Sequence, residues 1–158
     1  MKYAAQNMKG LYLGIGTIKT KKQAKKFIDE EADFIICPVV KEEIAELADE
    51  HDLLWIPGCM TPTEISMAEE CNATIIKLFP GSLLGPSYVQ SIKEIFPDLK
   101  FIPTGGVEPT ENNLKEWFRS GVAAVGMGSK LISKELIMNE DFEGLTASVK
   151  RTLQLVNL

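Results

Sequence analysis

Thr74-Ile75-Ile76-Lys77-Leu78-Phe79-Pro80-Gly81 has the pattern of a buried strand that carries one lysine and ends at a Pro-Gly pair. Lysine is among the residues least often fully buried, and removal from water lowers the pKa of its ammonium group. A neutral lysine amine can attack a carbonyl carbon and form a Schiff base. Taken alone, the stretch favours a different interpretation over a buried nucleophile: a lysine whose stem packs near a strand end while its amine reaches water.

Strand-like apolar runs recur on both sides of this stretch, roughly every twenty residues. We expect strands at residues 11–15, 34–37, 53–56, 74–79, 100–103 and 122–125. Helical spacing of apolar residues predicts helices at residues 21–30, 41–50, 61–70, 112–119 and 141–156, and one more after a loop at 80–86. Residues 1–9 resemble the end of a preceding helix. The alternation predicts one α/β domain over residues 1–158.

Two α/β architectures fit this alternation, a doubly wound sheet and a (β/α)8 TIM barrel. The strands are apolar on both faces, as parallel strands covered by helices are. Small and polar residues follow nearly every predicted strand, and a TIM barrel has its active site at the carboxyl ends of its strands. This favours the barrel. A closed barrel has eight βα units and about six are predicted here, so we expect the barrel to be N-terminally incomplete.

Two glycine-rich turns follow the last two predicted strands, Thr104-Gly105-Gly106 and Gly126-Met127-Gly128-Ser129. Glycine lets backbone N–H groups approach an anion closely, and TIM barrels often bind phosphate after their last two strands. Ordinary turn chemistry would also place glycine at strand ends. Because the turns occupy consecutive units, we favour a phosphate site made by Thr104, Gly105, Gly106, Gly128 and Ser129.

Other residues at element ends are less decisive. Thr17 ends the first predicted strand, where its hydroxyl could bind a carboxylate or merely lead into a loop. Cys59 follows a strand but has no neighbour in sequence that would activate it. His51 has the position of a surface residue at a helix end. Glu64 is better explained as part of a capping box with Thr61 than as a catalytic base.

Composition excludes several kinds of partner. The net charge is −5, and the chain has no basic stripe that could neutralise nucleic-acid phosphates. Cys37, Cys59 and Cys71 form no CxxC pair, so we expect no zinc site. An odd cysteine count fits a reducing cytoplasm, and no apolar run reaches the length of a membrane span.

Several motifs occur together in the order of one known family. They are Gly14-Ile15-Gly16-Thr17, Ile56-Pro57-Gly58-Cys59-Met60-Thr61-Pro62-Thr63-Glu64, Lys77-Leu78-Phe79-Pro80, Pro103-Thr104-Gly105-Gly106-Val107 and Val125-Gly126-Met127-Gly128-Ser129. Over residues 11–131 the chain closely resembles the 2-keto-3-deoxy-6-phosphogluconate (KDPG) aldolases, which overlap with the 4-hydroxy-2-oxoglutarate (KHG) aldolases. The segments around Pro57 and Lys77 are specific, whereas the glycine turns alone are not.

The resemblance implies a metal-free Schiff-base aldolase on a (β/α)8 barrel, usually a homotrimer, acting on a small 2-keto acid. Lys77 would be the Schiff-base lysine, and Thr17, Pro38 and Phe79 would line a pyruvate pocket. Gly105, Gly106 and Ser129 would bind the substrate phosphate. The reaction would cleave KDPG to pyruvate and glyceraldehyde 3-phosphate, or 4-hydroxy-2-oxoglutarate to pyruvate and glyoxylate.

The family also has about two earlier βα units, which carry a proton-transferring glutamate and a carboxylate-binding arginine that the matched motifs lack. Arg119 and Arg151 lie in predicted helices and do not replace that arginine. We therefore expect impaired activity in the sequence as given, from an N-terminally truncated form, a natural fragment completed by another chain, or a degenerate relative. The alternatives to an aldolase are a non-catalytic phosphate-binding assembly partner and, less favoured, a phosphosugar epimerase or isomerase.

Overall fold

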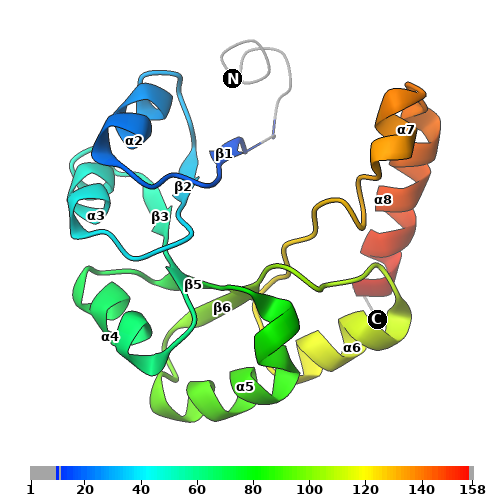
Figure 1. Ribbon diagram of the computed structural model, residues 1–158. Helices are drawn as coiled ribbons and strands as arrows, with labels where there is room; N and C mark the ends of the chain where they lie inside the picture. Colours follow the sequence, from blue (N-terminus) through cyan, green and yellow to red (C-terminus); the bar gives the residue numbers. More distant parts are fainter. Residues whose placement is uncertain (1–9, 11, 157–158) are drawn as a thin grey trace. The chain divides into compact units, whose positions relative to one another are not determined.

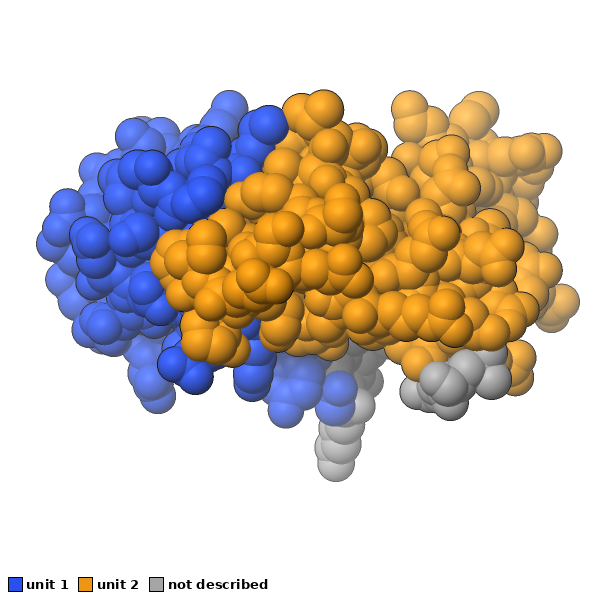
Figure 2. All heavy atoms as spheres, turned by 90° about the horizontal axis from the view of Figure 1, so that it is seen from below, with its two compact units in different colours: residues 1–77, 98–100 blue, residues 78–97, 101–158 orange. Residues whose placement is uncertain are grey.

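The computed structural model describes residue 10 and residues 12–156. Figure 1 labels the helices and strands, and Figure 2 colours the two compact units of the chain blue and orange. Unit 1 comprises residues 1–77 and 98–100, and unit 2 comprises residues 78–97 and 101–158. The boundary between Lys77 and Leu78 falls inside a strand.

Unit 1 is a succession of short parallel strands and helices. Its elements are β1 (Gly14–Ile15), α2 (Lys21–Ile28), β2 (Phe34–Ile36), α3 (Glu42–Asp49), β3 (Leu54–Ile56), β4 (Gly58–Cys59), α4 (Pro62–Glu70) and most of β5 (Ile75–Leu78). Strands β1, β2 and β3 form a parallel sheet in that order, with Ile35 opposite both Ile15 and Trp55. Ala24 and Ile44 from the helices are fully buried, as is Ile35.

Unit 2 contains the later helices. Its elements are α5 (Gly81–Ile95), most of β6 (Lys100–Pro103), α6 (Glu111–Arg119), α7 (Lys134–Met138) and α8 (Phe142–Val156). The second sheet has the order β4-β5-β6. Within unit 1 the Lys100 N–H donates to the Thr74 carbonyl at 3.1 Å, and within unit 2 the Thr104 N–H donates to Leu78 at 3.0 Å. Phe101 of β6 is fully buried.

The predicted strand at 122–125 is wrong. The Ala123 N–H donates to the Phe101 carbonyl, and the Gly126 N–H donates to the Pro103 carbonyl. The first segment advances three residues between these two hydrogen bonds, while β6 advances only two, so the first segment contains one extra residue. Such an extra residue is a bulge, which interrupts a regular ladder. Only an isolated parallel bridge between Thr104 and Gly126 remains.

The predicted loop at 80–86 is also wrong, because α5 begins at Gly81. The helix is interrupted at Gly85, whose φ of 72° is left-handed, and Pro86 starts the second helical part. Strand β4 and helix α7 were not predicted. Two residues are too few for a periodic pattern to indicate β4, and α7 is a five-residue helix that Ser133 caps through the Leu136 N–H at 3.2 Å. The helix end expected at residues 1–9 lies outside the described residues.

The predicted capping box at the start of α4 is confirmed. The Thr61 hydroxyl accepts from the Glu64 N–H at 3.3 Å, and Glu64 Oε2 accepts from the Met60 and Thr61 N–H groups, each at 2.8 Å. Partial burial opposes ionisation, yet these hydrogen bonds lower the pKa of Glu64. A carboxylate with a lowered pKa stabilises the fold above its ordinary pKa, and that stabilisation is lost as pH falls through the lowered value.

We expect Thr61→Ala to lower the free energy of unfolding by about 1 kcal/mol, because one helix N–H loses its partner. Thr63→Ala, at an exposed position in the same helical turn, is the matched control and should change stability by less than about 0.5 kcal/mol. Urea unfolding of both variants measures the difference. Equal losses would show that the box does not stabilise α4.

Candidate functional site

Lys77 lies on β5, and its backbone N–H donates to the Pro57 carbonyl at 2.8 Å. Its neighbours Ile76 and Leu78 are fully buried, whereas Lys77 and Ile75, on the alternate face, are half-buried. Burial lowers the pKa of Lys77, and the nearby Cys37 thiol acts in the opposite direction. The amine is therefore more often neutral, and more often nucleophilic, than that of an exposed lysine.

The ends of three strands meet beside this lysine. Because the Lys77 N–H bonds to Pro57, the parallel pattern places Lys77 opposite Gly58. A Cβ atom on Gly58 would lie 2.6 Å from the Pro38 backbone carbon and oxygen. The structure therefore packs Pro38, Gly58 and Lys77 on adjoining strand ends. Gly58 was not predicted as a site residue, although its place in the Pro57 motif pointed to it.

Thr17 follows β1 at the same edge of the first sheet. The N–H of the next residue, Ile18, donates to Ile36 at the end of β2, at 3.4 Å. The φ of Thr17 is 63°, a left-handed conformation that is rare for a β-branched residue and costs about 1–3 kcal/mol. Thr17 is exposed. Thr17, Pro38 and Lys77 all come from strand ends of unit 1, and the fourth predicted pocket residue, Phe79, belongs to unit 2.

The cysteines of unit 1 do not have the character of nucleophiles. Cys37 is fully buried, and its sulfur accepts a hydrogen bond from the Trp55 indole N–H at 3.4 Å. Burial raises the pKa of Cys37, and burial together with the charge of Glu64 raises the pKa of Cys59 to about 12. The three cysteines are free. Sequence reasoning missed that Cys37 lies near Lys77, and its place directly before Pro38 was the available signal.

The first glycine turn of unit 2 is tightly packed. Gly105 and Gly106 have φ values of 84° and 78°, and a Cβ on Gly106 would lie 2.5 Å from that of Ser82 at the start of α5. A Cβ on Gly105 would lie 3.7 Å from the ring of Phe79, which is 43% exposed. The buried Thr104 hydroxyl has no hydrogen-bond partner among the described residues. Backbone amides, a hydroxyl and a helix start are thus close together.

The second turn lies beside the first. A Cβ on Gly126 would lie 2.4 Å from Thr104 Cγ2, and Gly128 and Ser129 follow in exposed positions. Lys130 and Glu108 form an ion pair at 3.1 Å that links the two turns. Glu108 lies before α6, which begins at Glu111.

Three other residues that the sequence analysis considered lie outside the regions described above. His51 is exposed, as predicted, with its ring Nδ1 2.9 Å from the Leu47 carbonyl oxygen. Arg119 and Arg151 lie in α6 and α8. Within the described ranges, no helix has the length and apolar character that crossing a membrane requires.

Comparison with known proteins follows the same motifs. The family model "KDPG and KHG aldolase" matches residues 1–148. The chain is 33% identical over 120 residues to the 2-dehydro-3-deoxy-6-phosphogalactonate aldolase of Escherichia coli K12, a match covering 75% of this chain and 58% of the relative. It is 30% identical over 154 residues to the 2-dehydro-3-deoxy-phosphogluconate aldolase of Treponema pallidum, covering 97% of this chain and 72% of the relative.

The structural comparison agrees. A solved native KDPGal structure aligns with a TM-score of 0.84 at 28% identity, over 98% of this chain and 75% of that one. The α/β fold, with parallel sheets and, in the described residues, seven helices, is therefore that of these neighbours. The match to the first relative spans less than two thirds of that relative's length.

Proposed function

Because this chain belongs to the KDPG and KHG aldolase family, we propose that it is an aldehyde-lyase whose Lys77 forms a Schiff base with a 2-keto acid. The observation that carries the proposal is the setting of Lys77. Lys77 is half-buried near the end of β5, its pKa is lowered by burial, and Pro38 and Gly58 pack against each other on the adjoining strand ends. Groups whose pKa is shifted by burial and a specific neighbour cluster at functional sites.

The reaction can be written with Lys77 as the only side chain that forms a covalent bond to the substrate. The neutral Nζ of Lys77 attacks the keto carbon, and loss of water gives an iminium ion. The bond between C3 and C4 then breaks, its electron pair moves into the enamine, and the C4 hydroxyl loses a proton as it becomes the aldehyde. Protonation of the enamine and hydrolysis of the resulting iminium release pyruvate and restore Lys77. General acid–base groups accelerate such proton transfers by about 10²–10⁴-fold.

We assign pyruvate binding to Thr17, Pro38 and Phe79. The left-handed backbone of Thr17 supports its assignment, since strained residues concentrate at functional sites. We assign phosphate binding to Thr104, Gly105, Gly106, Gly128 and Ser129. The positive φ values of Gly105 and Gly106, together with the Thr104 hydroxyl that has no partner among the described residues, support a site for an anion.

These assignments favour a phosphorylated substrate. Cleavage of KDPG to pyruvate and glyceraldehyde 3-phosphate is the proposed reaction, with 4-hydroxy-2-oxoglutarate, which gives pyruvate and glyoxylate, as the unphosphorylated alternative. The names of the relatives, one a phosphogalactonate and one a phosphogluconate aldolase, support this class of sugar acid. We further propose a (β/α)8 barrel to which this chain contributes about six units, working as a homotrimer in the cytoplasm.

Borohydride reduction with pyruvate tests the proposal. The iminium is reduced to a stable secondary amine, so intact mass should show one pyruvyl adduct, and peptide mapping should place it on Lys77. A folded chain without an adduct, or with adducts spread over surface lysines, would contradict the Schiff-base assignment. Cleavage of KDPG and of 4-hydroxy-2-oxoglutarate is then compared by coupled assay of pyruvate release.

The rate of adduct formation should rise with pH and reach its plateau below the ordinary pKa of lysine. Burial lowers the pKa of Lys77, so the neutral amine becomes the main form at a lower pH than for an exposed lysine. The measurement is the initial trapping rate with cyanoborohydride across pH. A trapping rate that keeps rising through the ordinary pKa of lysine would contradict the prediction.

A further inference from the structure

An ion pair joins the two glycine turns of unit 2. Lys130 directly follows Ser129 in the second turn, and Glu108 lies two residues after Gly106 in the first. Lys130 Nζ is 3.1 Å from Glu108 Oε1, and the two side chains are 62% and 47% exposed. A pair this exposed is weak, because water screens the charges and two long side chains lose freedom in forming it. Lys130 can therefore exchange its partner at little cost.

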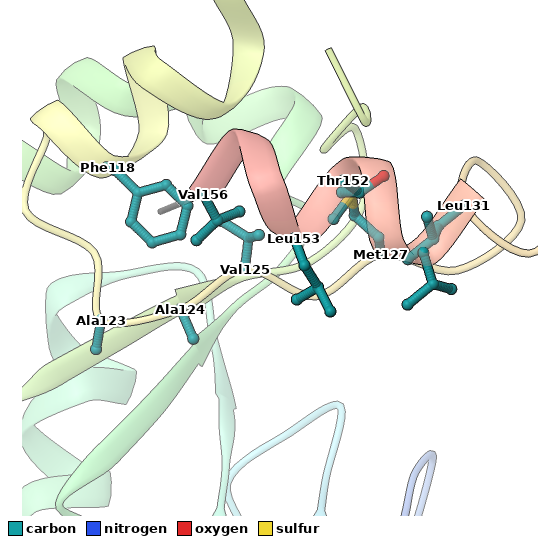
Figure 3. Close-up of a pocket in the computed structure, with 10 residues that line it drawn as sticks. Phe118, Ala123, Ala124, Val125, Met127, Leu131, Thr152, Leu153 and Val156 are labelled. Carbon is teal, nitrogen blue, oxygen red and sulfur yellow. The ribbon is translucent and has the colours of Figure 1, made fainter. Parts of the chain in front are cut away.

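The backbone that carries Lys130 is held in place. The Leu131 and Ile132 N–H groups both donate to the Gly128 carbonyl, each at 2.9 Å, which closes a turn around Lys130. Met127 and Leu131, on either side of Lys130, line an apolar pocket beside helix α8 (Figure 3). The ammonium group can therefore change its partner by rotation of its own side chain, without movement of the turn.

The backbone of Glu108 is fixed as well. Its N–H donates to Oδ1 of Asn113, in the first turn of α6, at 2.8 Å, and the preceding residue, Val107, is buried. In the sequence of the two turns, residues 104–108 and 126–130, Lys130 is the only basic residue. The ion pair with Glu108 therefore occupies the one positive side chain that these turns contain.

Space for an anion adjoins this charge. Gly105, Gly106, Gly128 and Ser129 are exposed, and a Cβ on Gly128 would meet no atom within 4 Å. A phosphate monoester carries a charge of about −1.5 to −2 at pH 7, which is more than a carboxylate carries. Hydrogen bonds from an ammonium group to phosphate oxygens are also charge-assisted and short. A phosphate at the turns therefore competes with the Glu108 carboxylate for the ammonium group.

We propose that Lys130 leaves Glu108 when a phosphorylated substrate binds, and that its ammonium group then donates to the substrate phosphate. Lys130 is thus a phosphate-binding residue, and Glu108 is a positioning residue that holds Lys130 until phosphate displaces the carboxylate. The inference rests on the phosphate assignment of the proposed function and deepens it by naming the charge that selects a phosphorylated 2-keto acid. Lys77 takes no part in this exchange.

Titration of the full chain with inorganic phosphate tests this, at constant ionic strength and with the amide resonances of Gly105 and Gly106 as the readout. Lys130→Gln should weaken phosphate binding at least about fivefold, whereas Lys130→Arg keeps the charge and should bind within about twofold of the parent. Glu108→Gln should strengthen binding at least about threefold, because the ammonium group loses its competing partner. That gain should fall below about 1.5-fold when Lys130→Gln is also present, since the two residues act together.

The ion pair of Glu111 with Lys115 is the matched control. It joins the same two residue types, with side chains 53% and 42% exposed, but it lies wholly within α6. Glu111→Gln changes the net charge as Glu108→Gln does, and it should leave phosphate affinity within about 1.5-fold of the parent, because solvent and salt screen an exposed charge.

Three results would overturn the proposal. The first is unchanged phosphate affinity in Lys130→Gln, and the second is an equal gain in Glu108→Gln and Glu111→Gln, which would reflect net charge alone. The third is a parent chain that binds no phosphate, which would also remove the phosphate assignment. The pyruvate adduct reports separately on Lys77, so failure here is distinguishable from failure of the Schiff-base reaction. The substituted side chains are exposed, so the variants lose no buried contact that folding requires.

Discussion

Lys77→Met is expected to abolish the borohydride-trapped pyruvate adduct completely while leaving the chain folded. Methionine keeps the length and the apolar stem of the half-buried side chain but has no nitrogen to attack a carbonyl. Removal of a desolvated amine leaves no hydrogen-bond donor to be buried, so stability should change by less than about 1.5 kcal/mol. Intact mass after reduction, with thermal unfolding beside it, measures both effects.

The control for this variant is Lys100→Met. Lys100 lies at the amino end of β6 and is exposed, so its loss removes one amine without touching the predicted site. The control should keep the full adduct. Affinity for inorganic phosphate should stay within about twofold in both variants, since the glycine turns contain neither lysine. Equal adduct in the two variants would assign the imine to another residue and leave a phosphate-binding protein as the better interpretation.

Gly58→Ala is expected to lower the free energy of unfolding by about 1–3 kcal/mol and to slow imine formation at Lys77. The new methyl group would lie 2.6 Å from the Pro38 carbon and oxygen and 2.8 Å from the Cys37 oxygen. These are backbone atoms, which cannot rotate away as a side chain can. Relief of this clash therefore requires a shift of β4 or of the chain after β2. Because Gly58 lies opposite Lys77, such a shift would also move the lysine.

Gly16→Ala is the matched control for stability. A Cβ on Gly16 has no atom within 4 Å, so the same added methyl group should change stability by less than about 0.5 kcal/mol. The midpoint of urea unfolding and the initial trapping rate are measured for each variant. If Gly58→Ala retained both parental values, the close packing of β4 on Pro38 would not be needed to position Lys77.

Hydrophobic runs that end at proline were sufficient to predict several strands. β2, β3, β5 and β6 lie where such runs ended at Pro38, Pro57, Pro80 and Pro103. The run at 122–125 has the same composition but is no strand, because a bulge depends on register against β6, which local sequence does not record. Strand β4 depends likewise on pairing with a segment nineteen residues later, from Gly58 to Lys77.

In the candidate site, too, features that depend on local sequence were easier to predict than contacts between segments far apart in the chain. One lysine among apolar residues singled out Lys77, but the stretch alone favoured an amine that reaches water. The lowered pKa of Lys77 comes from its burial in the folded chain. The position of Cys37 near that lysine and the contact of Gly58 with Pro38 were not predicted. Both arise from strands that are distant in sequence, and only the folded chain brings them together. The predicted roles of Thr17, Pro38, Phe79 and the glycine turns stay predictions.

The backbone of Thr17 has a consequence for substitution at this position. Glycine or asparagine in place of Thr17 would relieve the strain of a β-branched residue at φ 63°. If the Thr17 hydroxyl binds substrate, the same change would raise stability and weaken binding, so at this position stability and function would oppose each other.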